Sequence, residues 1–520
     1  MRGWRTSEKK PERAHRSATL TGALPRERWA LLALLAIMLL GAALRFYGLG
    51  VQSLWGDELA SWDFSERDAL SQVIQGVRSD IHPPLYFLIL HFTQWIFGDS
   101  EWALRLPSAI AGWLCIPAIY LLGKRLYSER EGIIAALLIA VLWAPIYFSQ
   151  EARSYSMLIL FSILTSYFWW DVMQNLRYRR ELPKREAIWY VICAVLCAYL
   201  HYFGLILVVL QGVALAALAH GMLRKVVFLY VPVAVAYLLW LPSMIYQFQY
   251  SKQRGDWIGD PTLSALPDYF QFLFGRSGLL SLAAWTLLSF LLIRGWDDLR
   301  PRRKGSGIPP GALLAAWALG PFVVAYAVSQ SSVQLLTEKN LLISLPAVYL
   351  LLARSITRAF SGKAAAVFQG TVAVGLAAAC LAYLLFSMDY YTDPTKEQVR
   401  QAASYVVNYE GPDTLVVRCD VDDRLDYYLK TGERDDVEAC EAEDFTKIEE
   451  KVREGDYHEV FHFISHTDPE PQLISKLQRD FQPVHYERFR GAAVVVYKVR
   501  KHAPAGLPRP EPPSSLPKRK

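Results

Sequence analysis

The chain has 520 residues, of which 53% are hydrophobic and 20% are charged. This apolar excess excludes a mainly disordered protein, and 6 cysteines in such a length exclude a disulfide scaffold. Residues 389–500 hold 15 basic and 25 acidic residues, whereas the rest of the chain holds 40 basic and 24 acidic ones. Because the basic part is also the apolar part, the pattern indicates a membrane protein and not a nucleic-acid-binding protein.

Eleven apolar runs follow the polar, basic segment 1–28. A helix needs about 20 mostly apolar residues to cross a bilayer. The runs cover 29–47, 102–123, 132–148, 154–172, 187–200, 203–219, 225–243, 278–293, 311–329, 339–353 and 364–386. The first run is too long for the core of a cleaved signal peptide, so it is predicted to stay as a span. The sequence therefore predicts a polytopic α-helical membrane domain over residues 29–388, with about 11 spans.

A further apolar run at 82–98 is ambiguous by hydropathy alone. If it lies on the outer surface, the inner segments hold 26 Lys and Arg and the outer segments before the C-terminal region hold 7. If it crosses, this contrast collapses, which the positive-inside rule disfavours. Residues 82–98 are therefore predicted to form a surface helix that begins at Pro83 and Pro84. The N-terminus is then cytoplasmic and the C-terminus extracytoplasmic.

The pattern changes after residue 388, where short apolar blocks alternate with amphipathic ones. Strands are expected at 414–419, 436–440, 459–464, 483–489 and 492–499, and helices at 396–409, 422–430, 443–454 and 470–480. Residues 389–500 are thus predicted to form a small extracytoplasmic α/β domain of three layers. Cys419 and Cys440 lie in it, either as a disulfide or as two buried thiols. The Pro-rich segment 501–520 is predicted to be disordered.

Ionisable residues in the membrane half gather at the predicted outer ends of the spans. They are Asp57 and Glu58 in SLWGDE, His82 before a double proline, Glu151 and Arg153 in SQEARSYS, His201 between two spans, and Lys339 at the start of a span. A transporter would place such groups near the bilayer midplane, on broken helices within repeated halves. A polar site at one face favours an enzyme that acts on a membrane-anchored substrate. A transporter or flippase of lipid-linked glycans is the alternative.

Each of these residues also has a structural interpretation. Asp57 and Glu58 could be an acidic pair in a loop that is only solvated. Glu151 and Arg153 could pair with each other at a helix start, and Lys339 could extend from its span to the interface. His82 could cap the surface helix, and His201 could bond a carbonyl. Histidines near carboxylates also raise a divalent metal site as an option, but no ligand spacing supports one.

Four motifs in residues 44–160 resemble the first part of the GT-C glycosyltransferases. They are LRFYGLGVQSLWGDE, DIHPPLYFLILH, ALRLPSAIAG and SQEARSYSMLIL, and KNLLISLPAVYLLLAR at 339–354 looks like a late span of the same family. The resemblance is closest to the family 39/83 branch, the relatives of protein O-mannosyltransferases and of the lipid A aminoarabinose transferase. It implies a large first outer loop with surface helices, in agreement with the charge pattern.

The resemblance also implies a reaction. The donor would be a sugar on a polyprenyl phosphate, and the acceptor a hydroxyl of a glycan, lipid or protein at the outer face of the plasma (inner) membrane. Asp57, the first residue of the acidic pair, would be the catalytic base of an inverting transfer. Substrate-binding roles are expected for Glu58, His82, Glu151, Arg153, Tyr155, His201 and Lys339.

Two departures from the family pattern concern the donor phosphate. Lys339 and Asn340 stand where many relatives have Arg-Tyr, and His82 stands where some have Lys. Both affect the expected phosphate contacts and not the class of reaction. No Gly-rich phosphate loop is present, so no soluble cofactor or nucleotide-sugar donor is expected.

Overall fold

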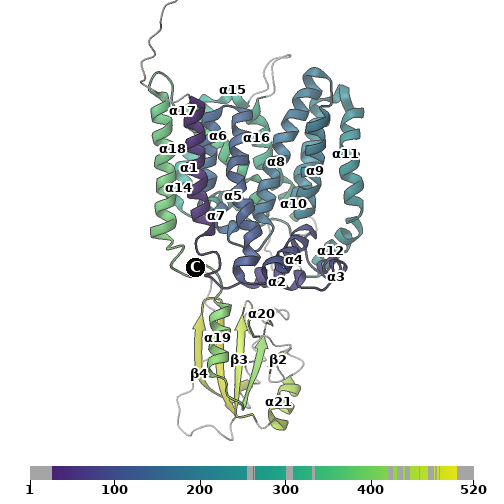
Figure 1. Cartoon of the computed structure of the whole chain (residues 1–520), viewed down its shortest axis with the longest axis vertical. Helices are drawn as coiled ribbons and strands as arrows, with labels where there is room; N and C mark the ends of the chain where they lie inside the picture. The colour runs from purple at the N-terminus through teal and green to yellow at the C-terminus, as the bar shows by residue number, and fades with distance from the viewer. Residues whose placement is uncertain are drawn as a thin grey trace, which may run out of the picture.

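The computed structural model describes residues 26–254, 262, 264–299, 309–330, 334–419, 426–429, 437–439, 445–455, 457–465, 474, 477–478 and 481–499. They form a bundle of long helices and a smaller sheet-containing domain at one end of it (Figure 1). We call this end of the bundle the domain end. The predicted tail 501–520, most of the predicted helix 470–480, Cys440 and the side chain of Cys419 lie outside the described residues, so the disulfide stays a prediction.

The bundle is built from helices that run between its two ends. They are α1 (Arg26–Phe46), α5 (Glu101–Leu126), α6 (Glu129–Val141), α7 (Trp143–Ser149), α8 (Tyr155–Gln174), α9 (Lys184–Leu200), α10 (Tyr202–Leu218), α11 (Leu223–Leu238), α14 (Gly278–Arg294), α16 (Pro310–Ser329), α17 (Leu345–Ala359) and α18 (Ala365–Ala382). Short turns extend several of them: η1 (Asn175–Arg179), η2 (His220–Met222), η4 (Asn340–Ser344) and η5 (Tyr383–Ser387).

Every one of the eleven predicted spans coincides with a helix or a bent helix pair. Among the described residues, 7 helices are long and apolar enough to cross a membrane, and 9 if each of two bent pairs counts as one span. The bent pairs are α6 with α7, at 58°, and α13 (Ala265–Leu273) with α14, at 103°. α9 and α10, of 17 residues each, are shorter but stand beside α8 in the bundle (Figure 1). The protein is thus a polytopic helical membrane protein.

Short helices cover the domain end. α2 (Gly56–Ser65), α3 (Leu70–Val77) and α4 (Leu85–Phe97) lie there together, near α12 (Leu241–Arg254) (Figure 1). The ambiguous run 82–98 contains α4, which begins at Leu85, directly after its N-cap Pro84. The prediction that this segment forms a surface helix and does not cross the bundle is confirmed.

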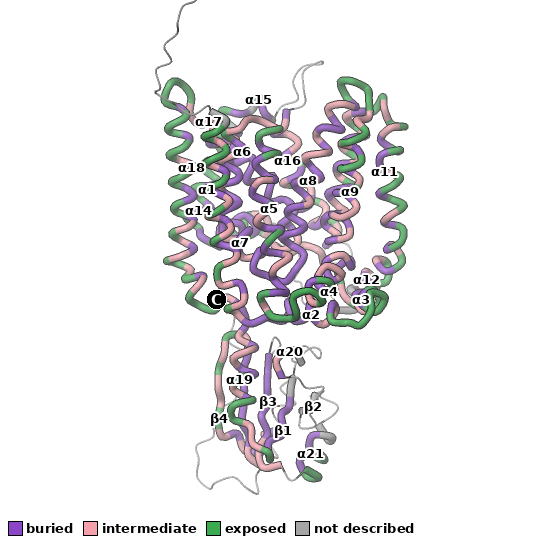
Figure 2. The backbone as a smooth tube through the Cα atoms, in the orientation of Figure 1, coloured by how far each residue is buried: buried purple, intermediate pink, exposed green. Residues whose placement is uncertain are grey.

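Burial separates central from peripheral helices. In the most apolar stretch of η4 with α17, 83% of the residues are buried, and in that of α8 with η1, 72% are buried. In that of η2 with α11, only 22% are buried. Figure 2 shows the same contrast, with exposed residues along α11 and α18 and buried residues through the middle of the bundle. The peripheral helices therefore present their apolar side chains to lipid, while the central ones position the polar groups described below.

A buried arginine supports the break between α6 and α7. The chain turns out of the helix at Leu142, where ψ is 147°. The Arg45 guanidinium of α1 donates to the carbonyls of Ile139, at 2.7 Å, and Ala140, at 3.0 Å. In return, the Gln150 amide donates to the backbone carbonyls of Arg45 and Tyr47 at the end of α1. Each helix end thus satisfies backbone groups of the other, as helix ends in an apolar interior require.

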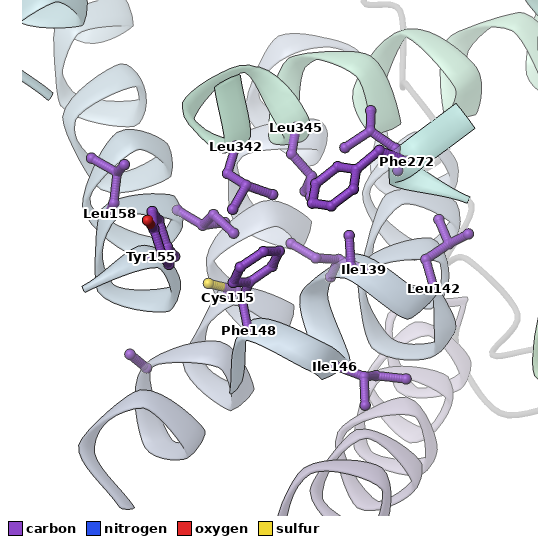
Figure 3. Packing of buried hydrophobic residues seen from close by; sticks show 14 of the residues in the cluster. Cys115, Ile139, Leu142, Ile146, Phe148, Tyr155, Leu158, Phe272, Leu342 and Leu345 are labelled. Atoms are coloured by element: carbon purple, nitrogen blue, oxygen red, sulfur yellow. The ribbon is translucent and has the colours of Figure 1, made fainter. Parts of the chain in front are cut away.

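Aromatic side chains fill the core beneath the domain end. Figure 3 shows side chains from several helices meeting there, among them Tyr155 of α8, Phe148 of α7 and Phe272 of α13. The Phe148 ring centroid lies 5.1 Å from that of Tyr155 and 5.9 Å from that of Phe272. This packing fixes the start of α8, and with it the loop at residues 150–154.

The C-terminal domain contains a five-stranded mixed sheet. Its strands are β1 (Thr414–Cys419), β2 (Val437–Ala439), β3 (Glu459–Ser465), β4 (Phe481–Phe489) and β5 (Ala492–Val499), in the order β2-β1-β3-β5-β4. β1 pairs in parallel with β2 and β3, whereas β5 pairs antiparallel with β3 and β4. In register, Val416 lies opposite Phe461, and Phe461 opposite Val496.

Alternate strand residues face two different helices. Val416, Phe461 and Val494 pack in the cluster that contains α19 (Val399–Tyr409). Val417, Val460 and Val495 pack with α21 (Phe445–Glu454). The short α20 (Asp426–Leu429) completes the described helices of this domain. The alternation of side chains along the strands therefore places the sheet between two helical layers, which is the three-layer arrangement expected from the sequence.

Candidate active site

The residues predicted to be functional meet at the domain end. Asp57 and Glu58 start α2, His82 precedes α4, Glu151 and Arg153 lie in the loop before α8, Tyr155 is the first residue of α8, His201 caps α10, and Lys339 precedes η4. These positions are separated by up to 282 residues in sequence. The structure therefore brings them together from several elements, although hydropathy alone predicted only that they share a face.

Asp57 and Lys339 form a partly exposed ion pair. The Lys339 Nζ lies 2.8 Å from Asp57 Oδ2, and each side chain is 31% exposed. The same Nζ lies 4.2 Å from the centre of the Trp55 ring, which favours a cation. Burial opposes the charge of Lys339, but Asp57 and Glu151 outweigh it and raise the pKa of Lys339 above its ordinary value. Lys339 therefore stays protonated beside the solvent-accessible carboxylate of Asp57.

Glu58, the neighbour of Asp57, is instead fully buried in a network of charges. Arg105 donates to both of its oxygens at 2.7 Å, and the Lys396 Nζ lies 2.8 Å from Oε1. The Ala152 N–H donates to the same oxygen at 2.8 Å. Burial by itself would raise the pKa of Glu58, but Arg105 and Lys396 outweigh burial and lower it to about 2. Glu58 is thus a permanent anion whose oxygens are both occupied by the protein.

Arg153 connects α2 with the start of α4. Its guanidinium donates to the Asp57 carbonyl and to Ser61 Oγ, both at 3.2 Å, and lies 3.2 Å from His82 Nδ1 and 3.4 Å from His82 Nε2. His82 Nδ1 lies 3.0 Å from Asp80 Oδ2, so it donates to that carboxylate and leaves Nε2 facing Arg153. Burial would raise the pKa of Asp80, but His82 and Arg153 lower it below its ordinary value.

His201 is a neutral, buried donor in this site. Its Nδ1 accepts a hydrogen bond from the Phe203 N–H at 3.2 Å, which places the proton on Nε2. Burial, with the nearby His82 and Arg153, lowers the pKa of His201 well below its ordinary value. The buried Nε2 has no hydrogen-bond partner among the described residues. The His201 ring lies 5.1 Å from that of His82 and 5.9 Å from that of Tyr155.

Glu151 is a second buried group without a partner. Its side chain is 0% exposed, and neither carboxyl oxygen has a hydrogen-bond partner within the described part of the chain. Burial raises the pKa of Glu151 above its ordinary value, although Lys339 and Lys396 oppose that shift. A buried polar group without a protein partner is costly, so it needs another partner such as an ordered water, an ion or a ligand.

The three acidic side chains of the site therefore differ in what they can do. Asp57 is the one that solvent reaches, Glu58 is held inside the protein, and Glu151 is buried and unsatisfied. Among the described residues, no group of three or more His, Cys, Asp or Glu is arranged to hold a metal ion. A cavity of about 490 Å³ near Arg125, Asp171 and Glu186 lies at the opposite end of the bundle and contains none of these residues.

Two residues of the network were missed from sequence. Arg105 lies within ALRLPSAIAG, a motif of the resemblance, but nothing in its surroundings marked it as the partner of Glu58. Lys396 lies in the segment that leads to the C-terminal domain, 338 residues after Glu58, and only the folded chain pairs the two.

A comparison with protein families finds a match within the membrane half of the chain. Residues 81–246 match the model of the family described as dolichyl-phosphate-mannose-protein mannosyltransferase. This segment carries His82, Glu151, Arg153, Tyr155 and His201. No curated protein sequence matches the chain.

Solved structures share the fold. ArnT from Cupriavidus metallidurans in the apo state is similar with a TM-score of 0.53 and 14% identity, over 90% of this chain and 98% of that chain. The same protein bound to undecaprenyl phosphate gives a TM-score of 0.53 and 13% identity, over 91% of this chain and 98% of that chain. The oligosaccharyltransferase of Archaeoglobus fulgidus, in complex with Zn and sulfate, follows with a TM-score of 0.49 and 13% identity, over 91% of this chain and 74% of that chain.

At these identities the structural likeness establishes the fold, and the family match covers the segment that carries most of the site. The predicted resemblance is confirmed to that extent. The chain is a polytopic membrane protein with the GT-C fold, and its residues 81–246 match the dolichyl-phosphate-mannose-protein mannosyltransferase family.

Proposed function

We propose that the protein is a membrane glycosyltransferase that moves a sugar from a polyprenyl-phosphate donor to a hydroxyl acceptor. The observation that carries the proposal is Asp57, an ionisable carboxylate that solvent reaches, beside the positive charge of Lys339. The match to mannosyltransferases and the fold shared with ArnT, which was solved with undecaprenyl phosphate, support this donor class.

Asp57 is the proposed general base. As the acceptor oxygen bonds to the anomeric carbon of the sugar, its proton passes to the Asp57 carboxylate. The bond between that carbon and the phosphate oxygen breaks on the opposite face, which inverts the configuration. The polyprenyl phosphate leaves as an anion and needs no general acid.

Lys339 is the proposed phosphate contact. Its ammonium is partly exposed and stays protonated, so it can stabilise the charge that the leaving phosphate gains. In the free protein it pairs with Asp57; a phosphate that takes this ammonium frees the carboxylate to accept a proton. Arg153 adds positive potential behind Asp57 while its guanidinium holds the α2 backbone.

The unsatisfied groups Glu151 and His201 are proposed to orient sugar hydroxyls, with His82 and Tyr155 beside them. The Glu151 carboxyl offers two oxygens that no described residue occupies, and His201 Nε2 offers a donor. Glu58 would act indirectly, by holding α2 in place. The site would lie at the outer face of the plasma membrane, at the level of the lipid headgroups, with the N-terminus cytoplasmic and the C-terminal domain extracytoplasmic.

The test is transfer in membranes that contain the protein, supplied with a panel of radiolabelled polyprenyl-phosphate sugars and total lipid or glycan acceptors. Label should move to an acceptor only with active protein, and NMR of the product should show an inverted anomeric centre. Donor that appears at the outer face without transfer would support a flippase instead. Retention of configuration would refute the inverting mechanism.

A further inference from the structure

The segment that joins the bundle to the C-terminal domain contacts the residues on both sides of Asp57. Lys396 binds the carboxylate of Glu58, and its neighbour Glu397 accepts a hydrogen bond from the Gly56 N–H at 3.2 Å. The Glu397 carbonyl also accepts from Ser53 Oγ. Two consecutive residues therefore hold the backbone before Asp57 and the side chain after it.

Lys396 is deeply enclosed for a lysine. Its side chain is 3% exposed, and besides Glu58 its Nζ donates to the Gln150 carbonyl at 2.7 Å. The Tyr147 ring lies 5.8 Å from the ammonium, and the like charge of Arg105 faces it across Glu58. A buried ammonium is costly and remains only where several groups compensate it. Here the groups that compensate it come from α2, α7 and the loop at residues 150–154.

The domain itself fixes this segment from the other side. The Tyr428 hydroxyl of α20 accepts from the Leu54 N–H at 2.7 Å, and the Tyr427 ring lies 5.2 Å from that of Trp62 on α2. Arg400 of α19 pairs with Glu101 at 2.9 Å. The segment 395–398 is thus held between a docked domain and the start of α2.

We propose that Lys396 is a positioning residue for Asp57, through which docking of the C-terminal domain sets the orientation of α2. Asp57 opens a helix that has no side-chain hydrogen bond at its N-cap, Trp55. Its direction depends on what holds Gly56 and Glu58, and those contacts include Glu397, Arg105, Lys396 and the Ala152 N–H. Movement of the domain would therefore misalign the proposed base. The inference rests on the proposed function of Asp57 for its catalytic consequence, but not for its structural one.

The test compares Lys396→Met, which keeps the length and removes the charge, with Lys396→Arg, which keeps a donor toward Glu58. Lys498→Met is the matched control, because Lys498 pairs with Glu459 at 3.3 Å on the C-terminal domain, away from α2. Loss of charge-assisted bonds should raise hydrogen exchange at the amides of residues 54–59 by at least about fivefold in Lys396→Met. Lys396→Arg should restore most of the protection, and Lys498→Met should leave it unchanged.

Kinetics separate positioning from substrate binding. Lys396→Met should lower kcat by about tenfold or more with little change in donor KM, since the affected group acts in the transition state. The pH profile is a second readout. Burial, followed by Arg105, lowers the pKa of Lys396 to about 8 although Glu58 and Glu151 oppose this. Activity should thus fall as pH rises through about 8, and Lys396→Arg should shift that fall to higher pH.

Unchanged exchange at residues 54–59, with kcat within about twofold of the wild type, would overturn the inference. If no polyprenyl-phosphate sugar is transferred by the wild type, the proposed function fails, and the exchange measurement still decides whether Lys396 holds α2. If Lys396→Met does not accumulate, Glu397→Gln takes its place, because it weakens the contact with Gly56 and leaves the buried charges paired.

Discussion

Replacement of Asp57 by Asn tests the proposed base most directly. Asn has nearly the same size and can still accept a hydrogen bond from Lys339, but it cannot take a proton at neutral pH. Positioned general bases contribute about 100- to 10,000-fold to rate, so transfer should fall at least about 100-fold. The substitution also removes the ion pair with Lys339, whose partners are each 31% exposed. Exposed pairs contribute about 0–1 kcal/mol, which corresponds to a loss of at most about fivefold. The two explanations therefore predict different magnitudes.

Asp63 offers a matched control on the same helix. It pairs with Arg67 at 2.8 Å and its side chain is 32% exposed, so Asp63→Asn removes an ion pair of the same length and exposure as that of Asp57. Both variants are assayed for transfer in membranes, with protein amount measured by immunoblot and folding by size-exclusion chromatography in detergent. Near-normal transfer by Asp57→Asn, or an equal loss in both variants, would refute the assignment of Asp57 as base.

Further predictions concern Glu58, the orientation in the membrane and the C-terminal domain. Glu58→Gln leaves Arg105 and Lys396 without a buried counter-charge, so thermal unfolding in detergent should show a loss of about 3–5 kcal/mol; a variant as stable as the wild type would contradict this. Because the pKa of Glu58 is about 2, its stabilisation is present above its ordinary pKa of 4.5 and is lost as pH falls toward 2, so the wild type should lose more unfolding temperature over that window than Glu58→Gln. Cysteines placed singly at positions 128 and 181 should resist an impermeant thiol reagent added to intact cells. Labelling of either would refute the proposed orientation of the protein in the membrane. A chain that ends at residue 388 should accumulate in the membrane yet transfer the sugar at least about tenfold more slowly, because it lacks the contacts to Gly56 and Glu58. A normal rate of transfer would show that the C-terminal domain has no role in the reaction.

Hydropathy and charge predicted the helices because those signals are local. The surface helix at 82–98 followed from counting basic residues, and the α/β domain from period-2 strands. The break between α6 and α7 was not predicted, although Pro145 cannot donate to the carbonyl of residue 141 and is a local sign of it; the Arg45 contact that supports the break joins residues 94 positions apart. The residues around the break do not indicate that Arg45 contacts it.

The site was predicted in composition but not in roles. Asp57 and Glu58 are neighbours, yet successive residues of an α-helix point about 100° apart, so one side chain reaches solvent and the other is buried. The resemblance identified Asp57 and Glu58 as a functional pair, but it did not predict which of the two side chains is buried. Lys396 carried no signal at all, because a lysine in an acidic, polar segment looks like any exposed one.

The Arg45 contacts also constrain the order in which the chain assembles. While α1 alone is in the bilayer, a charged side chain one residue from its end can reach outward to the headgroups. In the finished protein the same guanidinium points back toward Gly41 and inward to Ile139. That destination is made 94 residues later, which at 5–20 residues per second means a delay of roughly 5 to 20 seconds. The Arg45 guanidinium can therefore reach its final carbonyl partners only after α6 has been synthesised.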